Sequence, residues 1–253
     1  MKKCIKNYMN DFLLYIQFFT RIPINVQLEC SNENFSRGAM FFPVIGFIIG
    51  LIQYAVYLAF RNVLPASITA IFVVLSSIIL TGALHLDGLG DICDGFFAFK
   101  GGKERIIEIM KDSRIGVYCC VAIVFDILTK YQLIKLSIDS FMPQIMIIAP
   151  TIGRFAVVFI AYIGKNAKET GTGNIFIGNI KKMRIIISLI IAVLLSSIFV
   201  DIKQIAIIIL IVLVFVLLFN KFCESKINGL TGDTLGATNE LVEMLVLMIF
   251  FFF

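Results

Sequence analysis

Three aspartates with helical spacing are the residues of this chain most suited to chemistry: Asp87, Asp91 and Asp94. At about 100° per residue they lie within roughly a 60° arc on one face of a helix. Like charges at such distances raise one another's pKa, and residues 85–95 contain no lysine or arginine to balance them. A hard divalent cation with oxygen ligands is the usual solution. The spacing therefore predicts a Mg²⁺ site.

Glycines are interspersed among these acids, at Gly88, Gly90 and Gly95. Each weakens a helix by up to about 1 kcal/mol, which indicates that the positions have a use. We expect them to leave the surface bare, so that a phosphate can approach the backbone closely. The alternative interpretation of the segment is a polar helix start, whose acids are stabilised by the helix dipole.

The composition is that of a membrane protein. Of 253 residues, 59% are hydrophobic and only 15% are charged, and the mean hydropathy is +0.97. We predict an all-α, polytopic membrane protein with a single domain over residues 1–253. We do not expect a nucleic-acid partner. The oligomeric state stays open. Because ionisable groups are expensive beside an apolar span, the aspartates are better explained by function than by chance.

Apolar segments of membrane-spanning length recur along the chain, and we expect about seven transmembrane helices. Amphipathic helices lying on the membrane are expected over residues 1–20 and 103–114. The predicted spans are residues 39–60, 66–86, 117–136, 142–163, 185–200 and 204–219, followed by a last segment that starts near Thr231.

Two charged residues fall near the middle of predicted spans, Asp126 and Arg154. Neither should face lipid, and we expect them to pair with each other inside the bundle. The competing interpretation is functional, with Arg154 as a phosphate ligand.

Lysine and arginine are distributed unevenly between the predicted loops. If successive loops alternate between the two sides of the membrane, one side carries most of the positive charge. The segments on that side are the N-terminus and residues 87–116, 164–184 and 221–232. The positive-inside rule places them in the cytoplasm, in a cell (inner) membrane protein whose candidate site faces the cytoplasm.

Basic and acidic residues near the aspartates complete a plausible phosphate site. Lys111 and Arg114 can hold phosphate oxygens, although Arg114 and Asp112 can also form a simple exposed ion pair. His85 can take a proton or bind phosphate, and the alternative is a hydrogen-bonded packing residue. No nucleophile elbow, HExxH, Walker or GxGxxG pattern is present. Oxygen-ligated metal, basic groups and glycine loops are typical of phosphoryl or nucleotidyl transfer.

Three motifs resemble those of the cobalamin-5'-phosphate synthases, also called adenosylcobinamide-GDP ribazoletransferases. They are Leu84-His-Leu-Asp-Gly-Leu-Gly-Asp-Ile-Cys-Asp-Gly, Glu108-Ile-Met-Lys-Asp-Ser-Arg-Ile-Gly and Thr231-Gly-Asp-Thr-Leu-Gly-Ala-Thr-Asn-Glu. The early Phe18-Phe-Thr-Arg-Ile-Pro is also similar to the start of that family. The chain departs from the family pattern at Gly90, where alanine is frequent, and at Cys119, where we expect glycine.

The resemblance implies a Mg²⁺-dependent membrane transferase acting in the final assembly of the cobalamin nucleotide loop. Its substrates would be adenosylcobinamide-GDP and α-ribazole or α-ribazole 5'-phosphate, and GMP would leave. We expect His85, Lys111, Asp112 and Arg114 to act in catalysis. The residues expected to contact substrate are Arg154, Asp233, Asn239 and Glu240.

Two other classes of membrane protein remain as alternatives. CDP-alcohol phosphotransferases also carry Asp-Gly motifs at a membrane helix end, but the Ala-Arg pair expected after their first Asp-Gly is absent here. An ion-coupled transporter would use Asp126 and Arg154 at the membrane midplane. That function would place the three aspartates near mid-bilayer, whereas they come at the end of a span.

Overall fold

The computed structural model describes residues 2–97 and 101–252, and within these its regular elements are helices. This confirms the predicted all-α class. The helices are α1 (Lys2–Phe19), α2 (Asn32–Gly38), η1 (Ala39–Phe41), α3 (Phe42–Phe60), α4 (Ala66–Thr81), α5 (Leu84–Phe97), α6 (Lys103–Met110), α7 (Val117–Asp139), α8 (Ile145–Ile163), η2 (Thr172–Ile175), α9 (Lys182–Ser196), α10 (Ile202–Ile227), α11 (Gly232–Ile249) and η3 (Phe250–Phe252).

Five helical segments among the described residues are long and apolar enough to cross a membrane, or six if a bent pair counts as one span. The predicted span at residues 185–200 corresponds to α9, which has 15 residues. At 1.5 Å per residue it reaches about 22 Å, short of the roughly 30 Å hydrocarbon core. The final segment, Gly232–Phe252, is long enough, as predicted for a start near Thr231.

The bent pair replaces the predicted single span at residues 66–86. Helix α4 ends at Thr81, and α5 departs from it at an angle of 89°. Gly82 and Ala83 both adopt left-handed backbone conformations, with φ of 62° and 60°. Gly82 caps α4 by donating its N–H to the carbonyls of Ile78 and Ile79. The aspartates therefore lie on a separate helix that turns away from the span.

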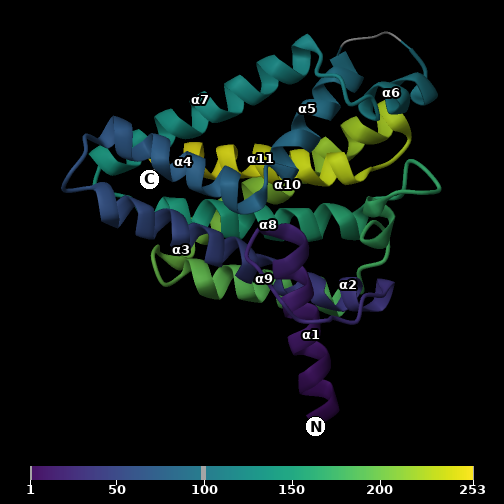
Figure 1. The fold of residues 1–253 in the computed structure, drawn as a ribbon, viewed down its shortest axis with the longest axis horizontal. Coiled ribbons are helices and arrows are strands. Elements are labelled where there is room, and N and C mark those ends of the chain that lie inside the picture. Colours follow the sequence, from purple (N-terminus) through teal and green to yellow (C-terminus); the bar gives the residue numbers. More distant parts are fainter. Residues whose placement is uncertain (1, 98–100, 253) are drawn as a thin grey trace.

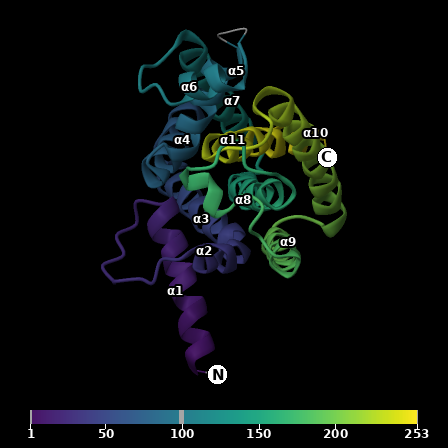
Figure 2. The same cartoon turned by 90° about the vertical axis from the view of Figure 1, so that its right-hand side faces the viewer.

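Helix α8 forms the centre of the bundle, and nearly all of its residues are buried. Figure 1 shows α3, α8, α9 and α11 running roughly side by side, and Figure 2 shows α3, α9, α10 and α11 arranged around α8. Helix α1 runs nearly perpendicular to these long helices (Figure 1). It was predicted to be amphipathic, and it buries Leu14, Tyr15, Ile16 and Phe19.

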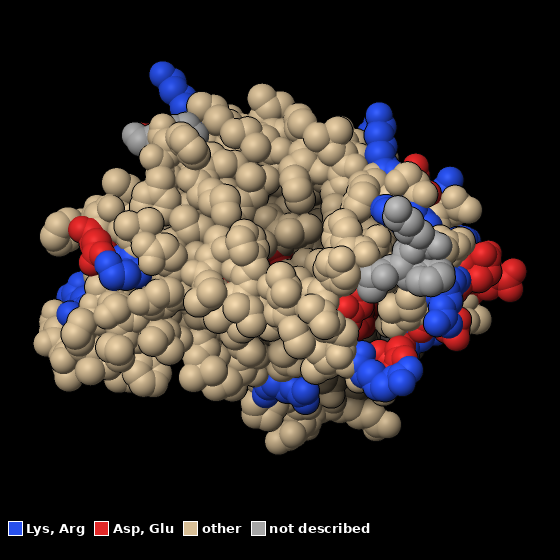
Figure 3. All heavy atoms as spheres, turned by 90° about the horizontal axis from the view of Figure 1, so that it is seen from above, with Lys and Arg blue, Asp and Glu red and all other residues tan. Residues whose placement is uncertain are grey.

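Charged side chains are most numerous at one end of the bundle. Figure 3 shows a broad, largely uncharged surface in the middle, a concentration of Lys, Arg, Asp and Glu at the right-hand end and a smaller charged group at the left. An uncharged band between charged ends is what a membrane-embedded surface requires.

Three predicted loops meet at this charged end. Ala167 donates its backbone N–H to Leu230 O at 2.9 Å, and Leu230 donates to Lys165 O at 2.8 Å. The Lys226 ammonium donates to the carbonyl of Phe96 at 3.5 Å. Segments far apart in the sequence are thus brought together around the N-terminus of α11 and the end of α5.

Candidate active site

Helices α5 and α11 pack with their backbones in close contact. A Cβ placed on Gly88 would lie 2.9 Å from the carbonyl oxygen of Asp233, and one placed on Gly236 would lie 3.1 Å from His85 O. Real Cβ atoms are not found at the first of these distances, so glycine is needed for this approach. The contact brings the aspartate face of α5 beside the first turn of α11.

The acids of the two helices form one negative cluster. Asp91 is half-buried, and its electrostatic neighbours include Asp87, Asp94 and Asp233 as negative groups and Lys168 as a positive one. Asp233 lies in the first turn of α11, whose N-terminus is closed by a capping box between Thr231 and Thr234. The acid that the sequence assigned to substrate binding, Asp233, thus stands with Asp87 and Asp91.

Asp94 has a different environment from the other two acids of its helix. It is buried, and its carboxylate accepts the backbone N–H of Gly116 at 2.7 Å and that of Cys119 at 2.9 Å. These donors are at the N-terminus of α7, where unpaired N–H groups attract an anion. Asp94 therefore ties α5 to the start of α7.

The fit of a Mg²⁺ ion can be judged from these donors. In the part of the chain that the structure describes, no group of three His, Cys, Asp or Glu side chains is already at metal-binding distances. The chemistry of the donors does suit the ion, because Asp87, Asp91 and Asp233 offer carboxylate oxygens in one region of negative charge. Closing the site around an ion would require side-chain rotation.

The glycines of α5 serve helix packing, and Gly88 also lines the cavity beside the acids, so close approach of a phosphate stays a prediction there. All three are buried. Gly88 faces the backbone of Asp233, Gly90 faces the Cys119 sulfur, and Gly95 faces Met110, each closer than a Cβ would allow. Neighbouring helices occupy the space because close contact between helices buries more surface than an open groove would.

A cavity lies beside the acidic cluster, between α1, α5, α8, η2 and α11. Its lining includes the side chains of His85, Asp87 and Asp233. The remaining lining is largely apolar and includes aromatic side chains of α1, α3 and the segment after η2. An apolar cavity with a few polar groups is the usual form of a small-molecule site.

His85 connects the cavity to the interior of the bundle. Its side chain is buried, and its Nδ1 lies 3.5 Å from an Arg154 guanidinium nitrogen. The ring also stacks on Phe19, with centroids 6.2 Å apart. These contacts are those of a packed, hydrogen-bonded residue, and its place in the cavity lining keeps a catalytic contact open as a prediction.

Charged side chains from α7, α8 and α11 form a second, deeply buried cluster. Asp126 and Arg154 point inward as predicted, with exposures of 2% and 1%. The predicted pair between them is wrong: Asp126 pairs with Lys130 at 3.2 Å, and Arg154 pairs with Glu243. The i,i+4 spacing on α7 explains the first pair, because it places both side chains on one helix face.

Lys130 is the residue that the sequence argument missed. It is buried and pairs with Glu240 and, at 3.4 Å, with Glu243. Its four-residue spacing from Asp126 was a signal in the sequence, since a lone lysine within an apolar span needs acidic partners.

Three residues that were expected to contact substrate belong to this buried cluster. Arg154 and Glu240 make the ion pairs just described, and Asn239 donates to Glu240 and Glu243, both at 3.0 Å. None of the three is among the residues that line the cavity. Their placement fits a structural role in joining α7, α8 and α11, and a role in substrate contact stays untested.

The Lys111–Arg114 segment is exposed at the charged end of the molecule. Arg114 donates to Asp112 at 2.6 Å, and its side chain is 87% exposed. The hydrogen bonds from Arg114 lower the pKa of Asp112 to about 2. The structure thus contains the exposed ion pair considered above, two residues before Gly116, which donates to Asp94. A phosphate-binding role for Lys111 and Arg114 stays a prediction.

Comparisons with known proteins find one family and close relatives that match nearly the whole chain. The family model described as Cobalamin-5-phosphate synthase matches residues 11–251. A protein of Clostridium kluyveri is 50% identical over 246 residues, covering 96% of this chain and 97% of its own length. One of Clostridium tetani is 49% identical over 243 residues, covering 96% of each chain.

Both of these relatives are named adenosylcobinamide-GDP ribazoletransferase. So is a protein of Clostridium botulinum that is 48% identical over 245 residues, covering 97% of this chain and 98% of its own. No solved structure matches the chain. The family match spans the acids of α5, the exposed Lys111–Arg114 segment and the capped start of α11, and the chain belongs to the cobalamin-5-phosphate synthase family.

Proposed function

We propose that this chain is an adenosylcobinamide-GDP ribazoletransferase, which joins adenosylcobinamide-GDP to α-ribazole or α-ribazole 5'-phosphate and releases GMP. The observation that carries the proposal is the acidic cluster of α5 and α11 beside a largely apolar cavity, in a chain of this family. The products would be adenosylcobalamin or its 5'-phosphate.

The reaction is a phosphoryl transfer. A ribose hydroxyl of α-ribazole attacks the phosphorus next to cobinamide, a new P–O bond forms, and the P–O bond to GMP breaks. The hydroxyl loses its proton, and the leaving GMP carries additional negative charge. Binding and orientation of the two substrates, with neutralisation of this charge, are what the protein must supply.

We propose that Mg²⁺ binds at Asp87, Asp91 and Asp233, with Asp94 holding α5 against the start of α7. The support is the carboxylate chemistry of the cluster and the engagement of Asp94 with two backbone N–H groups. When bound, Mg²⁺ would neutralise pyrophosphate oxygens and favour departure of GMP. Lys111 and Arg114 would add positive charge from the neighbouring segment.

We also propose that the site faces the cytoplasm of a bacterium-type cell (inner) membrane. The three loops around the site carry most of the basic residues, and basic loops stay on the cytoplasmic side. Charged water-soluble substrates such as adenosylcobinamide-GDP would reach the site from that side.

The test is turnover by purified protein in lipid vesicles. With Mg²⁺, adenosylcobinamide-GDP and α-ribazole 5'-phosphate, we expect GMP and adenosylcobalamin 5'-phosphate in equal amounts. A parallel reaction with CDP-diacylglycerol and an alcohol tests the phosphotransferase class, and solute flux across sealed vesicles tests transport. Release of CMP without GMP, or flux without either product, would refute the proposal.

A further inference from the structure

One wall of the cavity is made of aromatic rings from three separate parts of the chain. We call it the aromatic cage. Rings of α1 contact that of Phe176: the centroid of Tyr15 lies 6.1 Å from that of Phe176, and that of Phe19 lies 5.7 Å from it. Phe19 and Phe42 are 4.3 Å apart. The cage consists of Tyr15, Phe18, Phe19, Phe42 and Phe176, all of which line the cavity.

The five side chains of the cage offer little hydrogen-bonding capacity to a ligand in the cavity. The one polar group among its five side chains is the Tyr15 hydroxyl, which donates to Phe35 O at 2.7 Å. The polar side chains of the cavity, His85, Asp87 and Asp233, belong to α5 and α11. A ligand that fills the cavity therefore needs a flat apolar part at the cage and a polar part at the acids.

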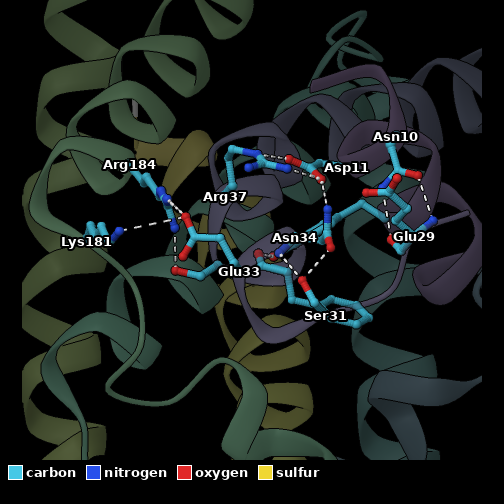
Figure 4. A network of polar contacts seen from close by, with 12 residues as sticks. Asn10, Asp11, Glu29, Ser31, Glu33, Asn34, Arg37, Lys181 and Arg184 are labelled. Carbon is cyan, nitrogen blue, oxygen red and sulfur yellow. Dashed lines mark hydrogen bonds and ion pairs between the residues drawn. The ribbon is translucent and has the colours of Figure 1, made fainter. Parts of the chain in front are cut away.

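A polar network holds the elements that carry the cage (Figure 4). The buried Asp11 of α1 accepts hydrogen bonds from Asn34 at 2.8 Å and from Arg37, both on α2. From α2, Ser36 donates to Asn179 O at 2.5 Å, and Glu33 accepts from Arg184 of α9. The network therefore joins α1, which carries three of the cage rings, through α2 to the segment just after Phe176. Such restraint before a ligand binds lowers the entropic cost of binding.

We propose that the aromatic cage binds the benzimidazole base of α-ribazole, with its ribose directed to the Asp87 and Asp233 end. This inference rests on the proposed function and names the place of one of its two substrates. A benzimidazole is a flat fused ring with little polar edge, and bases bind aromatic side chains by stacking. Asp87 and Asp233 line the same cavity as the cage and would be the acids available to its ribose.

The other parts of the two substrates suit this cage less well. Guanine carries several donors and acceptors on its edge, which would lose their water without partners among the cage side chains. The corrin ring bears polar amide groups around its rim and has the same difficulty. A lipid acyl chain is apolar but gains no ring stacking, and it becomes one of the outcomes of the test.

The test compares Phe176→Leu with the wild type, and with Phe215→Leu on α10 as a matched control. Phe215 stacks on Phe219 and does not line the cavity. In equilibrium dialysis of the protein in lipid nanodiscs, Phe176→Leu should weaken binding of α-ribazole 5'-phosphate about tenfold. Phe215→Leu should bind like the wild type. Phe176→Trp keeps an aromatic face and should restore binding relative to Phe176→Leu.

Ribose 5-phosphate, which lacks the base, should bind weakly and equally to all four proteins. In turnover, Phe176→Leu should raise the KM for α-ribazole 5'-phosphate and leave the KM for adenosylcobinamide-GDP within twofold. A change in the KM for adenosylcobinamide-GDP alone would place the other substrate in the cage and overturn the inference. Equal α-ribazole 5'-phosphate affinity in Phe176→Leu and the wild type would also overturn it.

A photoactivatable fatty acid distinguishes the lipid alternative. If it crosslinks to Phe176 and α-ribazole 5'-phosphate does not displace it, the cage holds lipid and the inference fails. Binding of α-ribazole 5'-phosphate in the cage without GMP release would refute the proposed function and leave the cage assignment standing. GMP release that is insensitive to Phe176→Leu would refute the cage assignment and leave the proposed function standing.

Discussion

Gly88 of α5 lies directly against the backbone of Asp233 of α11, so that a Cβ on Gly88 would come within 2.9 Å of the Asp233 carbonyl oxygen. Asp87, the residue before Gly88, and Asp233 line the same cavity. The distance between the two helices therefore influences the distance between the acids that we propose as metal ligands. The absence of a side chain at Gly88 lets two motifs more than 100 positions apart in the sequence come together.

Replacing Gly88 with alanine tests this relationship. Alanine favours a helix by about 1 kcal/mol over glycine, yet its methyl group would push α11 away from α5. A displacement of reacting groups by about 1 Å can cost roughly a hundredfold in rate, so we expect Gly88→Ala to lower kcat/KM by about 10- to 100-fold. Gly102→Ala is the control, because its Cβ would have its nearest neighbour at 3.5 Å. Equal activity of the two variants would show that the spacing of α5 and α11 is not critical.

Cysteine labelling tests which end of the bundle faces the cytoplasm. In a Cys-free background, Lys168→Cys should react with a membrane-impermeant maleimide only after cells are permeabilised. Phe141→Cys, at the opposite end between α7 and α8, has a side chain that is 91% exposed in the wild type and should be labelled in intact cells. Labelling of Lys168→Cys from outside intact cells would reverse the topology and remove the shared cytoplasmic site.

Neutralising Arg114 tests the role of the exposed segment. If Arg114 leaves Asp112 to hold a phosphate oxygen in the transition state, Arg114→Gln should cost about 2–4 kcal/mol in kcat/KM, the scale of losing one aimed donor. Arg61→Gln, in the turn after α3 at the other end of the bundle, should leave turnover unchanged. A wild-type rate for Arg114→Gln would show that Arg114 has no role in turnover and only forms a surface ion pair with Asp112.

Because of the buried charge cluster, we expect replacement of two lysines of α7 to have very different effects on the stability of the protein. Lys130→Met would leave Asp126, Glu240 and Glu243 without their shared cation, which typically costs about 3–5 kcal/mol. Lys135→Met removes a pair with Asp139 at a partly exposed position, which is worth under about 1 kcal/mol. Unfolding in detergent should show Lys130→Met far less stable than Lys135→Met. Similar stabilities would mean that the cluster does not hold α7 to α11.

The fold class could be predicted from the sequence because membrane helices are marked by long apolar runs. Local signals also located the start of α11, where Thr231 does cap the helix. The break between α4 and α5 could not be read in the same way, since the apolar run continues through Gly82. Its 89° turn depends on left-handed conformations at Gly82 and Ala83, which the surrounding packing selects.

The sequence predicted which acids share a face of α5, but it did not predict the contacts that α5 makes with other helices. Helical spacing grouped Asp87, Asp91 and Asp94, but it could not show that Asp94 binds the N-terminus of α7 or that Asp233 joins the other two. The aromatic cage was missed for the same reason, because Tyr15 and Phe176 meet only in the folded chain.

The most direct measurement of the metal site combines GMP release with Mn²⁺ binding, Mn²⁺ serving as a paramagnetic substitute for Mg²⁺, in four single variants. Asp87→Asn, Asp91→Asn and Asp233→Asn should each abolish GMP release and weaken Mn²⁺ binding, while the protein stays folded in detergent. Asp94→Asn should also abolish GMP release, because its carboxylate fixes the start of α7, but it should keep more of its Mn²⁺ affinity. Full activity with unchanged Mn²⁺ binding in the first three variants would contradict a metal-dependent transferase site between α5 and α11.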